Sequence, residues 1–220
     1  MTDLQTWLDA LAAQAEADFE ARNVARDEAL RESRALIRLC SSAIRAGHRS
    51  AWDEAESLLA QADAAGAALQ ALLAPYPDLF NAGYTQDALK ELVEARVTLA
   101  LISGGPLPAL DAVDIPYSTY LNGVCEAASE LRRRCLDVMR RDAMDEAERL
   151  LTVMDAAYEV LMSFSYPDAI TGGLRRRVDQ LRGVLERTRG DLTNSVQMQR
   201  LFKALERAEA RLESPANDEC

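Results

Sequence analysis

The chain has 220 residues, of which 49% are hydrophobic and 28% charged, so it can bury a globular core and is not intrinsically disordered. It contains no run of about 18 apolar residues that would span a membrane, and its acidic start is unlike a signal peptide. We therefore expect one cytoplasmic domain covering residues 1–220. The net charge of −11, taken alone, argues against a nucleic-acid-binding surface, because acidic side chains repel phosphate.

Helical periodicity persists along the first half of the chain, and no alternating strand pattern does. Helix ends are indicated by Gly47, by "PYP" at 75–77 and by "GGPLP" at 104–108, because glycine and proline interrupt helices. Thr85 is a candidate N-cap for the helix that follows it. The helices expected in this half cover about residues 4–21, 24–46, 51–73 and 86–103.

The second half is also helical, with "YPDAITGG" at 166–173 as its clearest interruption. A last helix is expected to begin near Thr193 or Asn194 and to fade by Ser214, which leaves 213–220 as a disordered tail. Short connections between long helices predict an all-α antiparallel bundle of about seven helices. The helices expected in this half cover about residues 117–140, 144–162, 174–189 and 194–214.

The cysteines and tryptophans carry no sign of a metal or redox site. The four cysteines show no CxxC spacing and His48 is the only histidine, which argues against a Cys/His zinc site. The three cysteines within helices are expected to fill the core, as are both tryptophans. These residues are Cys40, Cys125, Cys135, Trp7 and Trp52.

Arginines gather on one side of the helix expected at 24–46. Successive residues turn by 100°, which places five arginines within an arc of about 60° that runs for about 27 Å if the helix continues past Gly47. Only Asp27 shares this arc as an evident acidic partner. The pattern fits a track for phosphate groups, and it equally fits a solvated face paired with neighbouring helices. This arginine ridge consists of Arg31, Arg34, Arg38, Arg45 and Arg49.

Two pairs of glutamates lie about thirty residues apart in the sequence. Glu91 and Glu94 share one side of a helix, and so do Glu126 and Glu130. Both pairs point away from the apolar stripes, which favours an ordinary solvated surface. If the pairs faced each other, four carboxylates would repel unless a divalent cation lay between them. Oxygen ligands would then favour Mg²⁺ or Mn²⁺ over zinc.

Four segments, in order along the chain, resemble the translin family, which includes translin and translin-associated factor X. They are "RDEALRESRALIRLCSSAIRAGHR", "ELVEA", "NGVCEAASELRRRCLDVM" and "YPDAITGGLRRRVDQLRGVLERTRGDLT". The resemblance implies an all-helical subunit that assembles into a hollow octamer and binds single-stranded RNA or DNA. It also implies metal-dependent endoribonuclease activity where the acidic residues of factor X are present, and binding alone where they are absent.

By position, Glu91 and Glu94 match the two glutamates of factor X, while Glu126 falls on a family aspartate and Glu130 on a family glutamate. The resemblance therefore implies that all four hold Mg²⁺ or Mn²⁺, and that Glu91, Glu94 and Glu126 are catalytic, with Glu126 as a candidate base. Glu126 is one methylene longer than aspartate, which could displace the metal by about an ångström or weaken its binding.

The function that this resemblance implies is cleavage of single-stranded RNA inside a homo-oligomeric chamber. The arginine ridge, with Arg133 and Arg134, would grip the RNA backbone largely without regard to sequence. A first alternative is a non-catalytic oligomer that binds single-stranded RNA or DNA. A second is an adaptor whose helical surface makes only protein contacts.

Overall fold

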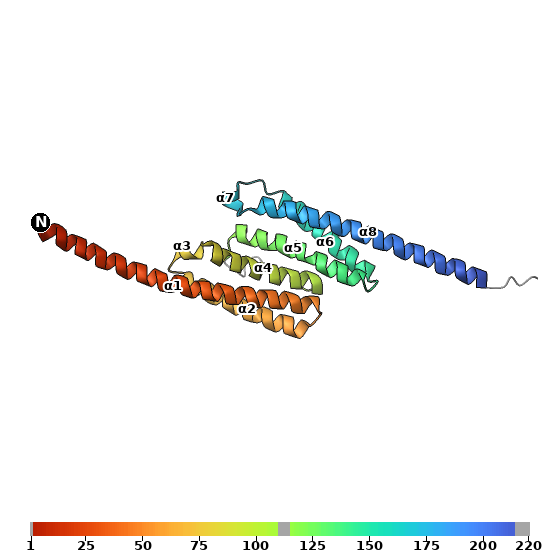
Figure 1. Cartoon of the computed structure of the whole chain (residues 1–220), viewed down its shortest axis with the longest axis horizontal. Coiled ribbons are helices and arrows are strands. Elements are labelled where there is room, and N and C mark those ends of the chain that lie inside the picture. Colours follow the sequence, from red (N-terminus) through yellow and green to blue (C-terminus); the bar gives the residue numbers. More distant parts are fainter. Residues whose placement is uncertain (1, 110–114, 214–220) are drawn as a thin grey trace, which may run out of the picture.

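A computed structural model describes residues 2–109 and 115–213, which form eight helices and no strand (Figure 1). This confirms the all-α prediction. The tail expected at 213–220 lies outside the described residues, apart from Glu213 at the end of the last helix. The helices are α1 (Thr2–His48), α2 (Trp52–Leu73), α3 (Pro77–Phe80), α4 (Gly83–Ser103), α5 (Tyr117–Met139), α6 (Met144–Met162), α7 (Asp168–Thr171) and α8 (Leu174–Glu213).

Two of the predicted helix breaks do not occur. α1 continues through Asn23 and α8 continues through Thr193. Both residue types lower helix propensity only modestly, and neither removes a backbone N–H as proline does. The Thr193 hydroxyl donates to the Arg189 carbonyl oxygen at 2.8 Å and so bonds within the helix. As a result, α1 and α8 each project beyond the bundle, at opposite ends of it (Figure 1).

The short helices α3 and α7 lie in segments that were predicted to be connections. Thr85 is not an N-cap, because α4 begins earlier, at Gly83. The Thr85 hydroxyl instead donates to the Leu79 carbonyl oxygen at 2.9 Å, which ties α3 to the first turn of α4.

α4 lies between α1 and α5 at the centre of the bundle (Figure 1). The helix pairs α1/α2 and α5/α6 are antiparallel, whereas α4 and α5 run in the same direction (Figure 1). Their register follows from two contacts, because the Thr119 hydroxyl donates to Gln86 Oε1 and Lys90 Nζ donates to Glu126 Oε2. The parallel arrangement places the glutamates of α4 at the same level as Glu126 of α5.

Gly123 lets α4 and α5 approach each other closely at this level. A Cβ atom at this position would lie 2.7 Å from Val93 Cβ and 2.8 Å from the Lys90 carbonyl oxygen. A backbone oxygen cannot move aside without moving its helix. Any side chain at this position would therefore separate α4 from α5 beside the glutamates.

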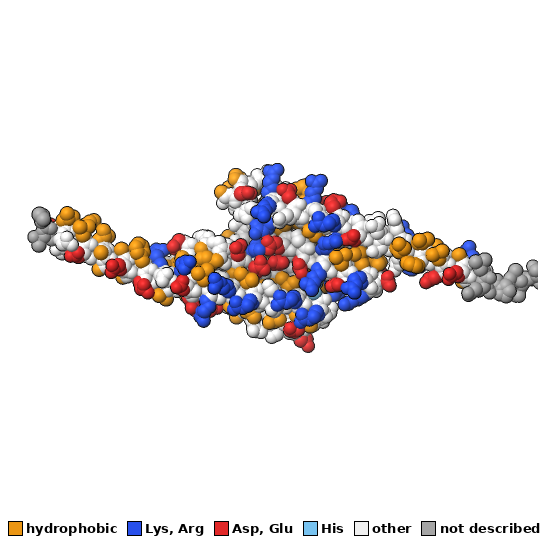
Figure 2. Space-filling model, in the orientation of Figure 1, with side chains coloured by type: hydrophobic (Ala, Val, Ile, Leu, Met, Phe, Trp, Pro, Cys, Tyr) orange, Lys and Arg blue, Asp and Glu red, His pale blue; other side chains and the backbone are white. Residues whose placement is uncertain are grey.

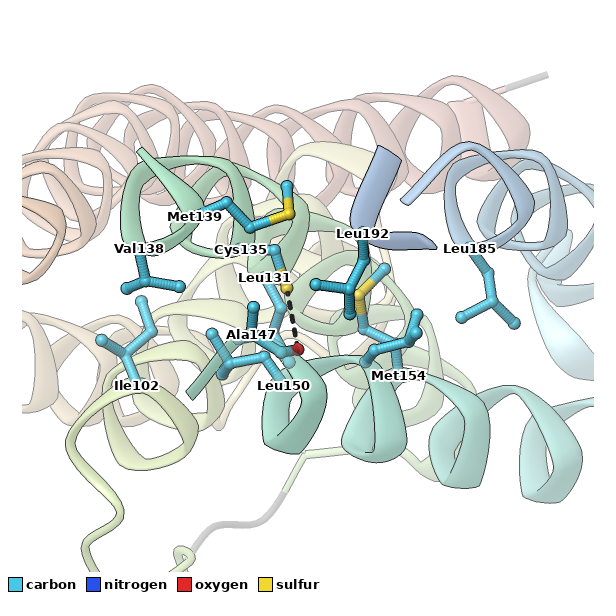
Figure 3. Packing of buried hydrophobic residues seen from close by; sticks show 11 residues of the cluster. Ile102, Leu131, Cys135, Val138, Met139, Ala147, Leu150, Met154, Leu185 and Leu192 are labelled. Carbon is cyan, nitrogen blue, oxygen red and sulfur yellow. Dashed lines mark hydrogen bonds between the residues drawn. The ribbon is translucent and has the colours of Figure 1, made fainter. Parts of the chain in front are cut away.

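Leucine, isoleucine and methionine side chains fill the core between α4, α5, α6 and α8 (Figure 3). Cys40, Cys125 and Cys135 are all buried, at 0 or 1% exposure, which confirms their predicted role. Trp52 packs against the core, but the prediction for Trp7 was wrong, because it lies on the projecting part of α1 and is 60% exposed. None of the described helices is long and apolar enough to span a membrane.

Candidate metal centre and nucleic-acid interface

Three carboxylates from two helices converge on one face of the bundle. Glu91 and Glu94 extend from α4 and Glu126 from α5, and one oxygen of each lies within 4.8 Å of the others. Opposite ligands of an octahedral Mg²⁺ are about 4 Å apart, so small side-chain rotations would bring these oxygens around one ion. We call these three residues the carboxylate cluster. Acidic side chains form a patch over α4 and α5 (Figure 2).

Burial and neighbouring negative charge act together on Glu94. Burial raises the pKa of Glu94 to about 8, and the charges of Glu91, Glu126 and Glu130 contribute, although Lys90 opposes them. A divalent cation among these oxygens would relieve this repulsion.

The pKa of Glu126 is lowered, in contrast to that of Glu94, because two cations contact its carboxylate. Its Oε2 accepts a hydrogen bond from Lys90 Nζ, and its Oε1 accepts one from Arg177 Nε at 2.8 Å. Burial raises the pKa of Glu126, but the two hydrogen bonds outweigh burial and hold it below its ordinary value. This arrangement does not favour Glu126 as a general base, and the two cations would compete with a metal ion for its oxygens. The side chain of Glu126, one methylene longer than the family aspartate, reaches both Lys90 and Arg177.

Glu130 lies beside the carboxylate cluster and not in it. Its Oε1 is 2.7 Å from Nε2 of His48, whose side chain is only 1% exposed. An ionised carboxylate can only accept, so His48 donates through Nε2 when Glu130 is charged. Glu130 remains close enough to raise the pKa of Glu94.

The arginine ridge lies along α1, and its members differ in how they are paired. Arg34 and Arg38 are exposed and make no ion pair within residues 2–109 and 115–213. Arg45 Nη2 donates to the Ser42 hydroxyl. The expectation that Asp27 is the one evident acidic partner was wrong, because long glutamate side chains reach the ridge from neighbouring positions. Arg31 pairs with Glu28 and Glu32, and Arg49 pairs with Glu54.

The adjacent residues Arg133 and Arg134 are in different environments. Arg133 is exposed and lines a cavity of about 520 Å³ together with Glu130, so it lies next to the acidic face. Arg134 is only 9% exposed, and its guanidinium donates to Glu146 and Ser50. Arg134 is therefore held in an internal ion pair, and the structure does not place it where RNA could contact it freely.

Comparison with known proteins identifies the family. No family model matches the chain. The chain is 32% identical over 190 residues to an uncharacterised protein of Methanocaldococcus jannaschii, covering 85% of this chain and 83% of that protein. It is similar to AfC3PO, alone and in complex with duplex RNA, with a TM-score of 0.80, 32% identity and coverage of 86% of this chain and 97–98% of AfC3PO. AfC3PO is a translin-family structure.

The chain belongs to the translin family. Apo-NeC3PO, at 17% identity, has the same fold, with a TM-score of 0.75 over 83% of this chain and 96% of NeC3PO. The family and the translin-like fold expected from the four sequence segments are thereby confirmed.

Sequence reasoning missed two residues that contact the carboxylate cluster, Lys90 and Arg177. Lys90 is one of only two lysines in the chain and directly precedes Glu91, which is a weak signal. Arg177 follows Arg175 and Arg176, and nothing local separates the three. In the structure Arg175 and Arg176 are exposed, whereas Arg177 reaches Glu126.

Proposed function

We propose that this chain is a metal-dependent endoribonuclease that cuts single-stranded RNA inside a homo-oligomer. The observation that carries this proposal is the convergence of Glu91, Glu94 and Glu126 within 4.8 Å. Burial, together with the neighbouring carboxylates, raises the pKa of Glu94 there. The complex of AfC3PO with duplex RNA supports RNA as the class of ligand.

The residues present fit a hard divalent cation, because their donors are all carboxylate oxygens. Glu91 and Glu94 would hold the ion, and Glu126 would join them after it releases Lys90 or Arg177. Bound there, Mg²⁺ or Mn²⁺ would supply a water of lowered pKa and positive charge facing the phosphate.

RNA would approach the carboxylate cluster along basic side chains. Basic side chains lie around the acidic patch, including a row along α1 (Figure 2). Arg34 and Arg38 are exposed on α1 without ion pairs among the described residues, and exposed Arg133 borders Glu130 on α5. These guanidinium groups can bind phosphates without reading bases, so binding would weaken as salt concentration rises.

The projecting parts of α1 and α8 support assembly into a homo-oligomer. Each carries apolar side chains at helical spacing, and a monomer would leave them in water. Second copies would cover these stripes, and a closed oligomer would enclose the acidic face. The family leads us to expect an octamer. The exposed side chains are Leu4, Trp7, Leu8 and Leu11 on α1, at 43–62%, and Met198, Leu201, Phe202 and Leu205 on α8, at 51–59%.

The second candidate is an oligomer that binds single-stranded RNA or DNA without cutting it. One observation favours it, because Lys90 and Arg177 already hold both oxygens of Glu126. If these ion pairs persist in the presence of metal ions, the ligand set stays incomplete while the basic surface remains.

The test incubates labelled single-stranded and duplex RNA with the protein in Mg²⁺, Mn²⁺ or EDTA. We expect the single strand to be cut faster, EDTA to stop cleavage, and the double variant Glu91→Gln/Glu94→Gln to lose about 100-fold or more in rate, as loss of a metal site does. Glu148→Gln, an exposed change on α6, is the matched control and should cut normally.

Cleavage that continues in EDTA or in the double variant would contradict the proposal. Salt-sensitive binding without cleavage in either metal would favour the second candidate. No salt-sensitive binding at all would favour the adaptor.

A further inference from the structure

A polar pocket of about 240 Å³ opens beside the carboxylate cluster, between the starts of α4 and α5 and the turn that joins α7 to α8. Two of its lining residues, Lys90 and Arg177, are the cations that contact Glu126. Asp87, which is exposed, is the one acidic residue in the lining. Its lining also includes Pro116, Ser118, Asn122 and Gly172.

Arg177 is held in place by groups other than Glu126. Its Nη1 donates to Asn122 Oδ1 at 3.1 Å and to the Gly172 carbonyl oxygen at 3.3 Å. Asn122 is 3% exposed, and its Nδ2 donates to the Ser118 and Thr171 carbonyl oxygens at 2.7 and 2.8 Å. This network fixes the guanidinium at the pocket even if Glu126 turns away.

The turn itself depends on glycine. Gly172 and Gly173 have φ angles of 60° and 79°, a conformation that glycine adopts without strain. They reverse the chain after α7, so that Arg177, in the first turn of α8, lies over the start of α5. The carbonyl oxygen of Gly172 is then available to Arg177.

The start of α5 adds positive potential to the pocket. α5 has 23 residues, and its N-cap residue Pro116 supplies no side-chain cap. The first N–H groups of such a helix lack partners within the helix, and its dipole favours an anion nearby. The pocket thus combines an ammonium, a guanidinium and a helix N-terminus, which together suit a phosphate group.

We propose that this pocket binds a backbone phosphate of RNA next to the bond that is cut, with Lys90 and Arg177 as its ligands. This inference rests on the proposed function, because the pocket shares Glu126 with the carboxylate cluster. When Glu126 turns toward a metal ion, Lys90 and Arg177 lose its negative charge and a phosphate replaces it. The phosphate is then held beside the carboxylate cluster, which sets the register of the RNA.

One consequence separates this pocket from a general attraction between the protein and anions. Without metal, Glu126 and phosphate compete for the same two cations. Neutralising Glu126 should therefore strengthen phosphate binding more than neutralising Glu130, which is one turn along α5 and pairs with His48 instead.

The experiment titrates 5′-adenosine monophosphate, inorganic phosphate and adenosine into the EDTA-treated full chain and follows binding by calorimetry and ³¹P NMR. We expect both phosphates to bind and adenosine not to bind. Lys90→Met and Arg177→Met should each weaken phosphate binding about fivefold or more, as loss of a charge-assisted hydrogen bond does. Arg177→Lys keeps the positive charge but loses the paired N–H donors of the guanidinium, so it should weaken phosphate binding less than Arg177→Met does.

The matched controls are Arg175→Met, an exposed change on α8 that should bind normally, and Glu130→Gln. Glu126→Gln should bind phosphate about fivefold more tightly and Glu130→Gln less than twofold. Glu126 contacts both cations, whereas Glu130 pairs with His48, and the Glu91 carboxylate that also accepts from Lys90 Nζ at 3.0 Å is unchanged in both variants.

The proposal would be overturned if phosphate bound with equal affinity to the wild type, Arg177→Met and Arg177→Lys. It would also be overturned if Glu126→Gln and Glu130→Gln strengthened phosphate binding equally. Cleavage is not the readout, so a protein that cuts RNA but fails these tests loses only the pocket. A protein that passes them but never cuts retains a phosphate-binding pocket, but it loses the nuclease assignment and with it the position of the pocket next to a cut bond.

Discussion

Apolar side chains recur at helical spacing both at the centre of the bundle and at the projecting ends of α1 and α8. The two regions differ in burial, because charged side chains are half-buried at the centre and apolar side chains are exposed at the ends. At the centre, Gly123 brings α4 and α5 together and half-buries the glutamates, where charge becomes costly. At the ends, apolar stripes remain exposed although nothing in their spacing distinguishes them from core stripes. We therefore propose that one chain alone forms the metal site at the centre, whereas the apolar stripes at the ends are covered by other copies of the chain.

The largest effect is expected at the ends. Leu201→Asp/Leu205→Asp on α8 places charges in the proposed contact between copies. Burial of a leucine contributes about 2 kcal/mol, so losing two at each contact should weaken assembly more than 100-fold. Sedimentation velocity should show smaller particles, and circular dichroism should show an unchanged helix content.

Arg207→Gln, an exposed change in the same segment, should leave the particle size unaltered. A wild-type chain that sediments as a monomer at micromolar concentration would show that the ends do not serve assembly.

At the centre, Gly123→Ala should separate α4 from α5. Alanine favours a helix over glycine by about 1 kcal/mol, but its Cβ would clash with Val93 and with the Lys90 carbonyl oxygen. We expect a net loss of about 2 kcal/mol in the free energy of unfolding, as for overpacked cores, together with weaker Mn²⁺ binding. Urea unfolding and calorimetry measure these two quantities.

Gly190→Ala on α8 is the matched control, because its Cβ would meet no atom within 4 Å. It should stabilise the protein by about 0.5–1 kcal/mol. If Gly123→Ala and Gly190→Ala were equally stable, the role of Gly123 would not be to let α4 and α5 approach closely.

A smaller effect concerns the charge of Glu94. Its pKa of about 8 in the folded protein exceeds its ordinary value of 4.5, so between these pH values the unfolded chain binds fewer protons than the folded one. The free energy of unfolding of the metal-free protein should therefore fall as pH rises from 4.5 to 8, then level off. Glu94→Gln should remove this slope and stabilise the metal-free protein at pH 8 by about 1–2 kcal/mol.

Urea unfolding in EDTA at pH 5, 6.5 and 8 measures this dependence, with Glu148→Gln as the control that should keep the slope. At pH 8, adding Mn²⁺ should raise the free energy of unfolding of the wild type but not that of Glu94→Gln. A slope that survives in Glu94→Gln would mean that another group causes it.

Much of the helical pattern could be predicted from the sequence, but the continuity of α1 and α8 could not. The polar stretches near Asn23 and Thr193 resemble connections, yet neither contains a residue that stops a helix. The resemblance to a family predicts the glutamates as metal ligands, whereas their periodicity alone predicts a solvated surface. Only the parallel packing of α4 and α5 explains how Glu91 and Glu126 meet.

The cations around the glutamates could not be predicted, because their partners are distant in sequence. Lys90 lies 36 positions from Glu126, and Arg177 lies 51 positions from it. Arg133 and Arg134 illustrate the same limit, since the packing of α6 against α5 places Glu146 beside only one of them. An arginine within a run of arginines carries no local mark of its tertiary partner.

Diffraction from a crystal soaked in Mn²⁺ would test the central claim most directly. The account predicts an anomalous peak bound by oxygens of Glu91 and Glu94 at about 2.2 Å, with Glu126 turned away from Lys90 or Arg177. A carboxylate cluster without a peak, with Lys90 still bound to Glu126 in saturating Mn²⁺, would contradict it.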